Sequence, residues 1–120
     1  MDDRIHFIEH EGKQILLVDA SHVSAQQMLL LLEYVQVLVA KHARESLLIL
    51  ADLTGAKIDR TVATRIKEVL TLDRPFVKKT AWVGAENIPH ALMESFHTFS
   101  QREIVLFKTR EEAMNWLVEA

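Results

Sequence analysis

The chain has 120 residues, no cysteine and a formal net charge of −3 at pH 7. Without cysteine there are no disulfides, thiolate nucleophiles or cysteine-based metal sites, and the small net charge gives no global attraction to nucleic acid or anionic membranes. An apolar content of 49% at this length is typical of a single globular domain, here residues 1–120. No apolar run reaches the roughly 20 residues of a membrane span, so we expect no transmembrane segment and a cytoplasmic location.

The first expected element is a β-hairpin. Residues 4–11 and 13–19 have strand-like composition on either side of Gly12, and Glu11-Gly12 is the expected turn. The second arm contains a continuous apolar run, which is typical of a strand covered on both faces.

The next element is a long helix. Ser24 followed by Gln27 is a capping-box pattern, and it predicts a helix over residues 24–42. The polar positions of this helix form one narrow stripe, so more of its surface is apolar than in an ordinary surface helix. Three apolar residues border this stripe: Leu29, Leu30 and Val37. We expect one of three roles for them: completing the core, forming a homodimer surface, or lining a cavity for a lipid-like ligand.

The remainder of the chain alternates strands and helices. Strands are expected at residues 47–50, 79–83 and 104–107, and helices are expected to begin near residues 59–61, 87–89 and 109. In the helix near residue 89 we place four side chains on one apolar face: Ile88, Leu92, Phe96 and Phe99. The order β-β-α-β-α-β-α-β-α predicts an α/β fold with a mixed, largely parallel five-stranded sheet, helical cover and one antiparallel edge strand.

The loop after the strand at residues 47–50 is the main candidate site. Ligands of open α/β sheets bind outside the carboxyl ends of the strands, where helix N-termini present unpaired N–H groups. The predicted ligand- or partner-binding residues combine this loop with the glycine of the next strand-to-helix corner: Thr54, Lys57, Asp59, Arg60, Thr61 and Gly84. The simpler interpretation is that Thr54-Gly55 only forms a turn and that Asp59 or Thr61 only caps the following helix.

Three segments carry a resemblance to a known family. They are LLILADLTGAKID at residues 47–59, VKKTAWVGA with a helix ending near Phe96 and Phe99, and IVLFKTREEAMNWL ending at Leu117. Together they resemble the STAS domain, and more narrowly its SpoIIAA-like branch, whose fold is shared with lipid-binding CRAL-TRIO domains. The resemblance implies a binding or regulatory module rather than an enzyme.

The resemblance also implies a phosphorylation site. In anti-sigma-factor antagonists of this family, an Asp-Ser-Ser-Gly helix start follows the strand and turn, and a partner kinase phosphorylates the second serine. The corresponding residues here are Asp59, Arg60, Thr61 and Val62, so the aspartate is retained while the first serine and the glycine are replaced. Thr61 supplies the hydroxyl at the phosphorylated position.

Two further groups of side chains have ordinary explanations. His90, Glu94 and His97 share one face of an expected helix, and two imidazoles with a carboxylate can hold a divalent metal. We favour a solvated stripe instead and predict no metal site. Neither a GxGxxG nor a Walker pattern occurs, so no cofactor is predicted.

A modest basic patch would form if five cations gathered on one surface: Lys57, Arg60, Arg65, Lys78 and Lys79. Charged side chains beside a strand are usually only solvated, and nucleic acid is not an expected partner.

We therefore expect a non-enzymatic module without catalytic residues, which associates with an unknown protein partner through residues 54–61 and the following helix. The first alternative is a small apolar or anionic ligand bound between this loop and the Gly84 corner, as the CRAL-TRIO likeness implies. The second alternative is a metal-assisted enzyme that uses His90, Glu94 and His97.

Overall fold

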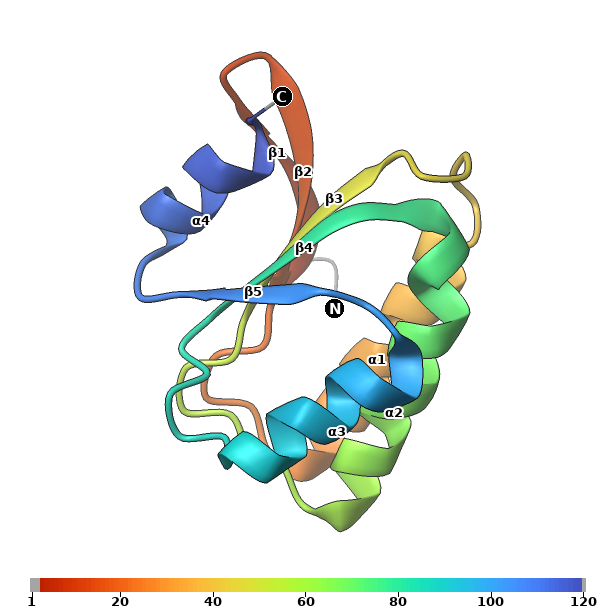
Figure 1. The fold of residues 1–120 in the computed structure, drawn as a ribbon, viewed down its shortest axis with the longest axis vertical. Helices are drawn as coiled ribbons and strands as arrows, with labels where there is room; N and C mark the ends of the chain where they lie inside the picture. Colours follow the sequence, from red (N-terminus) through yellow and green to blue (C-terminus); the bar gives the residue numbers. More distant parts are fainter. Residues whose placement is uncertain (1–2, 120) are drawn as a thin grey trace.

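The computed structural model describes residues 3–119, so residues 1–2 and 120 of the predicted domain lie outside the described residues. The elements are β1 (Ile5–His10), β2 (Lys13–Asp19), α1 (Ala25–Val39), β3 (Leu47–Asp52), α2 (Arg60–Asp73), the 3-10 turn η1 (Arg74–Phe76), β4 (Val77–Val83), α3 (His90–Ser100), β5 (Ile104–Phe107) and α4 (Arg110–Leu117). The five strands form one sheet in the order β1-β2-β3-β4-β5 (Figure 1). Only β1 and β2 pair antiparallel, so the predicted mixed, largely parallel sheet is confirmed.

The hairpin turns where the sequence predicted. Glu11 and Gly12 both have positive φ, at 49° and 80°, as two-residue hairpin turns that match the strand twist require. The pairing of His10 with Lys13 leaves these two residues as the whole loop. Glycine adopts such angles without steric cost, which explains its place in the turn.

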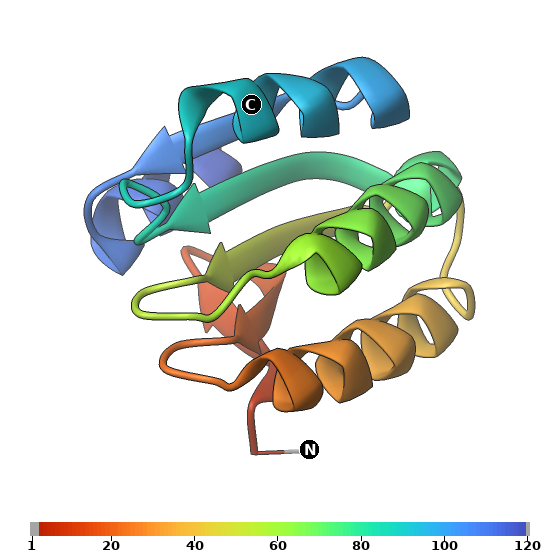
Figure 2. The same cartoon turned by 90° about the horizontal axis from the view of Figure 1, so that it is seen from below.

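The position of the helices follows from the handedness of the crossovers. Three crossovers lead from β2 through α1 to β3, from β3 through α2 to β4, and from β4 through α3 to β5, and each moves one strand further in the same direction. Because such crossovers are right-handed, α1, α2 and α3 all lie on one face of the sheet. Helix α4 follows the last strand and covers the other face (Figures 1 and 2).

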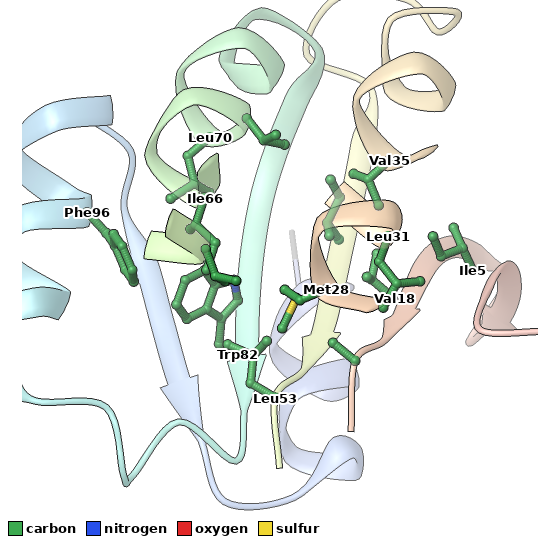
Figure 3. Close-up of a cluster of buried hydrophobic side chains, with 14 of the residues drawn as sticks. Ile5, Val18, Met28, Leu31, Val35, Leu53, Ile66, Leu70, Trp82 and Phe96 are labelled. Atoms are coloured by element: carbon green, nitrogen blue, oxygen red, sulfur yellow. The ribbon is translucent and has the colours of Figure 1, made fainter. Parts of the chain in front are cut away.

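The two faces of the sheet produce two apolar cores. Ile49 of β3 packs in the larger core beneath α1, α2 and α3, whereas Leu48 and Leu50 pack with Ala113 and Leu117 of α4. Figure 3 shows part of the larger core. Successive strand residues point to opposite faces, so a strand covered on both sides needs apolar residues at every position. The unbroken apolar runs in β2 and β3 are explained in this way.

Helix α1 begins with the predicted capping box. The Ser24 hydroxyl accepts from the Gln27 N–H, and the Gln27 side chain accepts from the Ser24 N–H. The helix ends at Val39, three residues before the predicted end. Of the bordering apolar residues, Leu29 packs against the core, whereas Leu30 and Val37 are more than half exposed. None of the helices in residues 3–119 has the length and apolar character of a bilayer-spanning segment.

The predicted apolar face of α3 is wrong at one position. Phe96 is fully buried, but Phe99 is 59% exposed, and Ser100 occupies the buried position instead. Residues four apart lie above one another on a helix, so the buried row continues from Phe96 to Ser100. The hydroxyl of Ser100 donates to the Phe96 carbonyl at 2.7 Å, which allows a polar side chain to be buried there.

Candidate functional site

The predicted site residues gather where parallel strands end. Thr54 and Lys57 follow β3, Gly84 follows β4, and the carboxyl ends of both strands lie at the same edge of the sheet. The two loops touch: a methyl group added at Gly84 would lie 2.1 Å from the Thr54 hydroxyl and 2.6 Å from the Thr54 nitrogen. The structure therefore brings Thr54 and Gly84 together, with Thr54 exposed and Gly84 half-buried.

The far end of the loop leads into α2. Asp59 is the N-cap, and its carboxylate accepts from the Val62 N–H at 2.8 Å. Lys57, Arg60 and Thr61 are exposed at this end. Of the two predicted caps, Asp59 is the one used, and Thr61 is an exposed residue in the first turn.

Two matching turns support this edge of the sheet. Asp19 ends β2 and accepts through Oδ1 from the N–H and hydroxyl of Ser21, at 3.1 and 2.6 Å. Asp52 ends β3 and accepts in the same way from the N–H and hydroxyl of Thr54, at 3.0 and 2.7 Å. Asp19 and Asp52 are also directly opposite one another in the sheet. The predicted loop therefore begins with one of two aspartate turns that share the same hydrogen-bond pattern.

An arginine from the opposite face joins these turns. Arg110, the first residue of α4, donates through Nε to Asp52 at 2.8 Å and places a terminal nitrogen 3.3 Å from Asp19. Arg4 adds hydrogen bonds to the carbonyls of Asp19 and Ser21, at 3.0 and 3.1 Å. We call this cluster the aspartate clamp, and it consists of six residues: Arg4, Asp19, Ser21, Asp52, Thr54 and Arg110.

The aspartate clamp is charged. Burial acts to raise the pKa of Asp52, but hydrogen bonds from Thr54 and Arg110 outweigh burial and hold that pKa below its usual value. At Asp19, burial again acts to raise the pKa, and the bonds from Ser21 with the charges of Arg110 and Arg4 lower it overall. Both carboxylates are thus ionised near neutral pH and bound to neighbouring donors, an arrangement suited to fixing the loops.

A small hollow lies between the loop and the Gly84 corner, where the sequence predicted a ligand. Its volume is about 160 Å³, and its walls include Ile58, Gly84 and Leu92. Small-molecule sites usually enclose about 300–1,000 Å³. The large crevices of open α/β sheets form where the strand order reverses direction, and from β2 to β5 this sheet never reverses. The small volume of the hollow is consistent with the absence of such a reversal between β2 and β5.

The other predicted groups do not assemble. Glu94 pairs with His90 at 3.3 Å, whereas the Nδ1 of His97 lies 2.7 Å from the Arg102 carbonyl oxygen. No group of three metal-binding side chains gathers anywhere in residues 3–119. Lys79 does not join a basic patch with the loop, because it lies in the first half of β4 and its ammonium donates to the carbonyl of Trp116.

Gly84 provides a stability test of the contact between the two loops. We expect Gly84→Ala to lower the free energy of unfolding by about 2–4 kcal/mol, because a side chain there adopts a φ of 73° and also meets Thr54. The matched control is Gly12→Ala, with a φ of 80° and no atom within 4 Å of the added carbon, and we expect it to cost about 1 kcal/mol. Urea unfolding measures both variants, and equal losses would mean that the two loops do not touch.

The sequence contained a signal for the aspartate clamp that the prediction did not use. An apolar run followed by Asp, one residue and a hydroxyl residue occurs twice, as Asp19 with Ser21 and as Asp52 with Thr54. No comparable signal marks Arg110, which lies 58 residues from Asp52. Comparison with protein-family models, with curated proteins and with solved structures found no match.

Proposed function

We propose that this chain is a non-enzymatic regulatory module that resembles the SpoIIAA-like branch of STAS domains and binds a protein partner through residues 54–61 and the first turn of α2. The observation that carries the proposal is the exposure of every polar side chain of this loop above a fixed base. Thr54, Lys57, Asp59, Arg60 and Thr61 are all exposed. Pre-organised exposed loops lose little conformational entropy when a partner binds.

The aspartate clamp supplies the fixed base. Asp52 holds Thr54 at the start of the loop, and Arg110 holds Asp52. Further along, the Lys57 N–H donates to the Val23 carbonyl at 3.1 Å, and Asp59 caps α2 at the end of the loop. The backbone is therefore anchored at its beginning, middle and end, while the side chains of Lys57, Arg60 and Thr61 remain exposed to a partner.

We also propose that phosphorylation of Thr61 regulates this association. Thr61 is exposed in the first turn of α2, where the N-terminal end of a helix favours negative charge. Arg60 is adjacent in the chain and belongs to no ion pair within residues 3–119, whereas Arg65 already donates to Gln36. A phosphate there would add charge beside Asp59 and change the surface that the partner reads.

The alternative, a small ligand between the loop and the Gly84 corner, rests on the hollow at that place. Its volume of about 160 Å³ suits a small anion or a few water molecules better than a lipid-like molecule. Protein association is the better supported of the two functions because it needs an exposed surface and no cavity.

Pull-down from extracts of the native host tests the proposal. We expect wild-type protein and Thr61→Ala to retain the same partner, and Thr61→Glu and Lys57→Glu to weaken its binding about tenfold or more, because charges at an interface set specificity. Lys41→Glu is the matched control, since Lys41 is exposed just after α1, away from the loop. Equal recovery by all five proteins would rule out association through this loop, and a loss with Lys57→Glu alone would exclude only the phosphorylation switch.

A further inference from the structure

The largest cavity described lies between α3 and the edge strand β5, and its lining begins at Ala85 and Glu86, just after the Gly84 corner. It has a volume of about 710 Å³. Figure 2 shows α3 running beside β5 at this end of the sheet. The α3 residues that line it fall at helical spacing and so form one face: His90, Met93, Glu94, His97 and Thr98. We call this cavity the α3–β5 groove.

The floor of the α3–β5 groove is apolar. Ile88 and Met93 contribute from α3 and the segment before it, and Ile104 and Leu106 contribute from β5. Ile104 and Leu106 are two residues apart and therefore point to the same face of the sheet. Leu106 is 47% exposed, so α3 leaves part of this apolar surface uncovered.

The charged side chains of the α3–β5 groove are all acidic. Glu86, Glu94 and Glu103 line it, and its lining contains no lysine or arginine. The groove therefore has a negative potential around an apolar floor, which favours a ligand with positive charge and apolar side chains.

His97 adds another hydrogen-bond acceptor. Its Nδ1 lies 2.7 Å from the Arg102 carbonyl oxygen, and a carbonyl only accepts, so Nδ1 carries the proton. In the neutral ring the other nitrogen, Nε2, then has a free lone pair. Carboxylates and an imidazole acceptor together favour a ligand that is rich in N–H donors, such as lysine and arginine side chains.

The adjacent strand has an unused edge. β5 is the last strand in the sheet and pairs only with β4. It is short, with four apolar residues, and contains neither a charge nor a proline, two of the features that usually protect an edge from pairing. Extended peptides bind such edges by adding a strand, with side chains entering neighbouring pockets.

We propose that the α3–β5 groove binds an extended segment of a partner protein in which basic residues alternate with apolar residues. The segment pairs with the free edge of β5 and places its apolar side chains on Met93, Ile104 and Leu106. Its lysine or arginine side chains reach Glu94 and Glu103. No residue of the loop 54–61 lines this groove, although Ile88 lines both the groove and the small hollow at the Gly84 corner. The groove is therefore a second binding site whose test does not depend on the proposed function.

The test uses a short fluorescein-labelled peptide in which lysine alternates with valine and leucine, with binding followed by fluorescence anisotropy. We expect saturable binding to the wild-type protein, and a loss of about tenfold or more in affinity for the double variant with Glu94→Lys and Glu103→Lys. Glu111→Lys is the matched control, because Glu111 is an exposed glutamate on α4 at the other face of the sheet. Lys57→Glu in the first loop should leave the affinity unchanged.

A second pair of peptides tests the contributions of charge and of strand pairing to binding separately. Replacing lysine by glutamate should abolish binding, and replacing alternate valines by proline should also abolish it, because proline lacks the N–H that a strand donates. Hydrogen exchange should show new protection of β5 amides in the complex. The proposal is overturned if the lysine peptide does not bind saturably, if the glutamate peptide binds equally well, or if the double variant keeps wild-type affinity. Binding that tolerates proline would exclude pairing with β5.

Discussion

Phe96→Ala should lower the free energy of unfolding by about 3–5 kcal/mol, one of the two largest effects expected of a single substitution in this chain. Phe96 is fully buried, and its ring meets the Trp82 ring edge-on, with centroids 5.7 Å apart (Figure 3). It is the largest of the side chains that are fully buried. Truncation removes the apolar surface and also leaves a cavity between α3 and the sheet. Urea unfolding followed by circular dichroism measures the loss.

Phe99→Ala is the matched control for this measurement, because it is the same substitution one turn later on the same helix. Phe99 is 59% exposed, so we expect a change within about 0.5 kcal/mol. If the two variants lose similar amounts, α3 is rotated about its axis relative to this structure. That result would also remove the described face of the α3–β5 groove.

Asp73 should make the protein less stable as the pH rises from about 4 to about 7. Asp73 is 3% exposed at the end of α2, and burial raises its pKa from 3.8 to about 7, although Arg102 and Arg65 act to lower it. The side chain of Arg102 is also buried, and it donates to the Leu70 carbonyl at 3.2 Å and to the Thr80 hydroxyl. The Asp73 carboxyl group is therefore protonated in the folded protein under conditions that ionise it in the unfolded chain.

The sign and size of this effect follow from proton linkage. Between the two pKa values the unfolded chain has released the Asp73 proton and the folded protein still holds it, so raising the pH favours unfolding. The contribution is fully present below about pH 4 and is lost as the pH passes about 7, with a total of about 4 kcal/mol at most. Asp19 and Asp52 have lowered pKa values, so their contributions are lost only as the pH falls below about 4.

Asp73→Asn isolates the effect, because asparagine resembles the protonated carboxyl and does not titrate. We expect the stability of this variant relative to wild type to increase from pH 5 to about pH 7 and to level off towards pH 8, as measured by urea unfolding at each pH. Asp52→Asn is the control, and its difference from wild type should be constant over the same range. A constant difference for Asp73→Asn as well would mean that Arg102 keeps Asp73 ionised throughout.

Local patterns were sufficient for most of the elements. The Glu11-Gly12 turn, the capping box of Ser24 and Gln27, and the start of α4 at Thr109 depend on interactions between residues at most three apart in the chain. Phe99 shows the limit of this reasoning, because periodicity allows either the third or the fourth following residue to share a face with Phe96. Only the position of α3 against α2 and β4 selects Ser100 as the buried residue.

In the candidate site, too, the local interactions were easier to predict than those between distant residues. Asp59 as a helix cap and Thr54 in a turn were predicted, since both are local interactions. The sequence placed Gly84 beside this loop through the general rule for ligand sites in α/β sheets. The binding of Arg110 to Asp52 and Asp19 was not predicted, because it joins residues 58 and 91 positions apart. Composition and spacing contain no information about which distant charges meet.

The sequence by itself determined the α/β class, the sheet of five strands with one antiparallel edge, and the exposed polar loop after β3, because apolar periodicity and turn residues act over short stretches of chain. The tertiary structure alone decided the order β1-β2-β3-β4-β5, the placement of three helices on one face and α4 on the other, and hence the aspartate clamp and the α3–β5 groove. Those features depend on the direction in which each crossover returns to the sheet, and that direction brings together side chains that no local pattern relates.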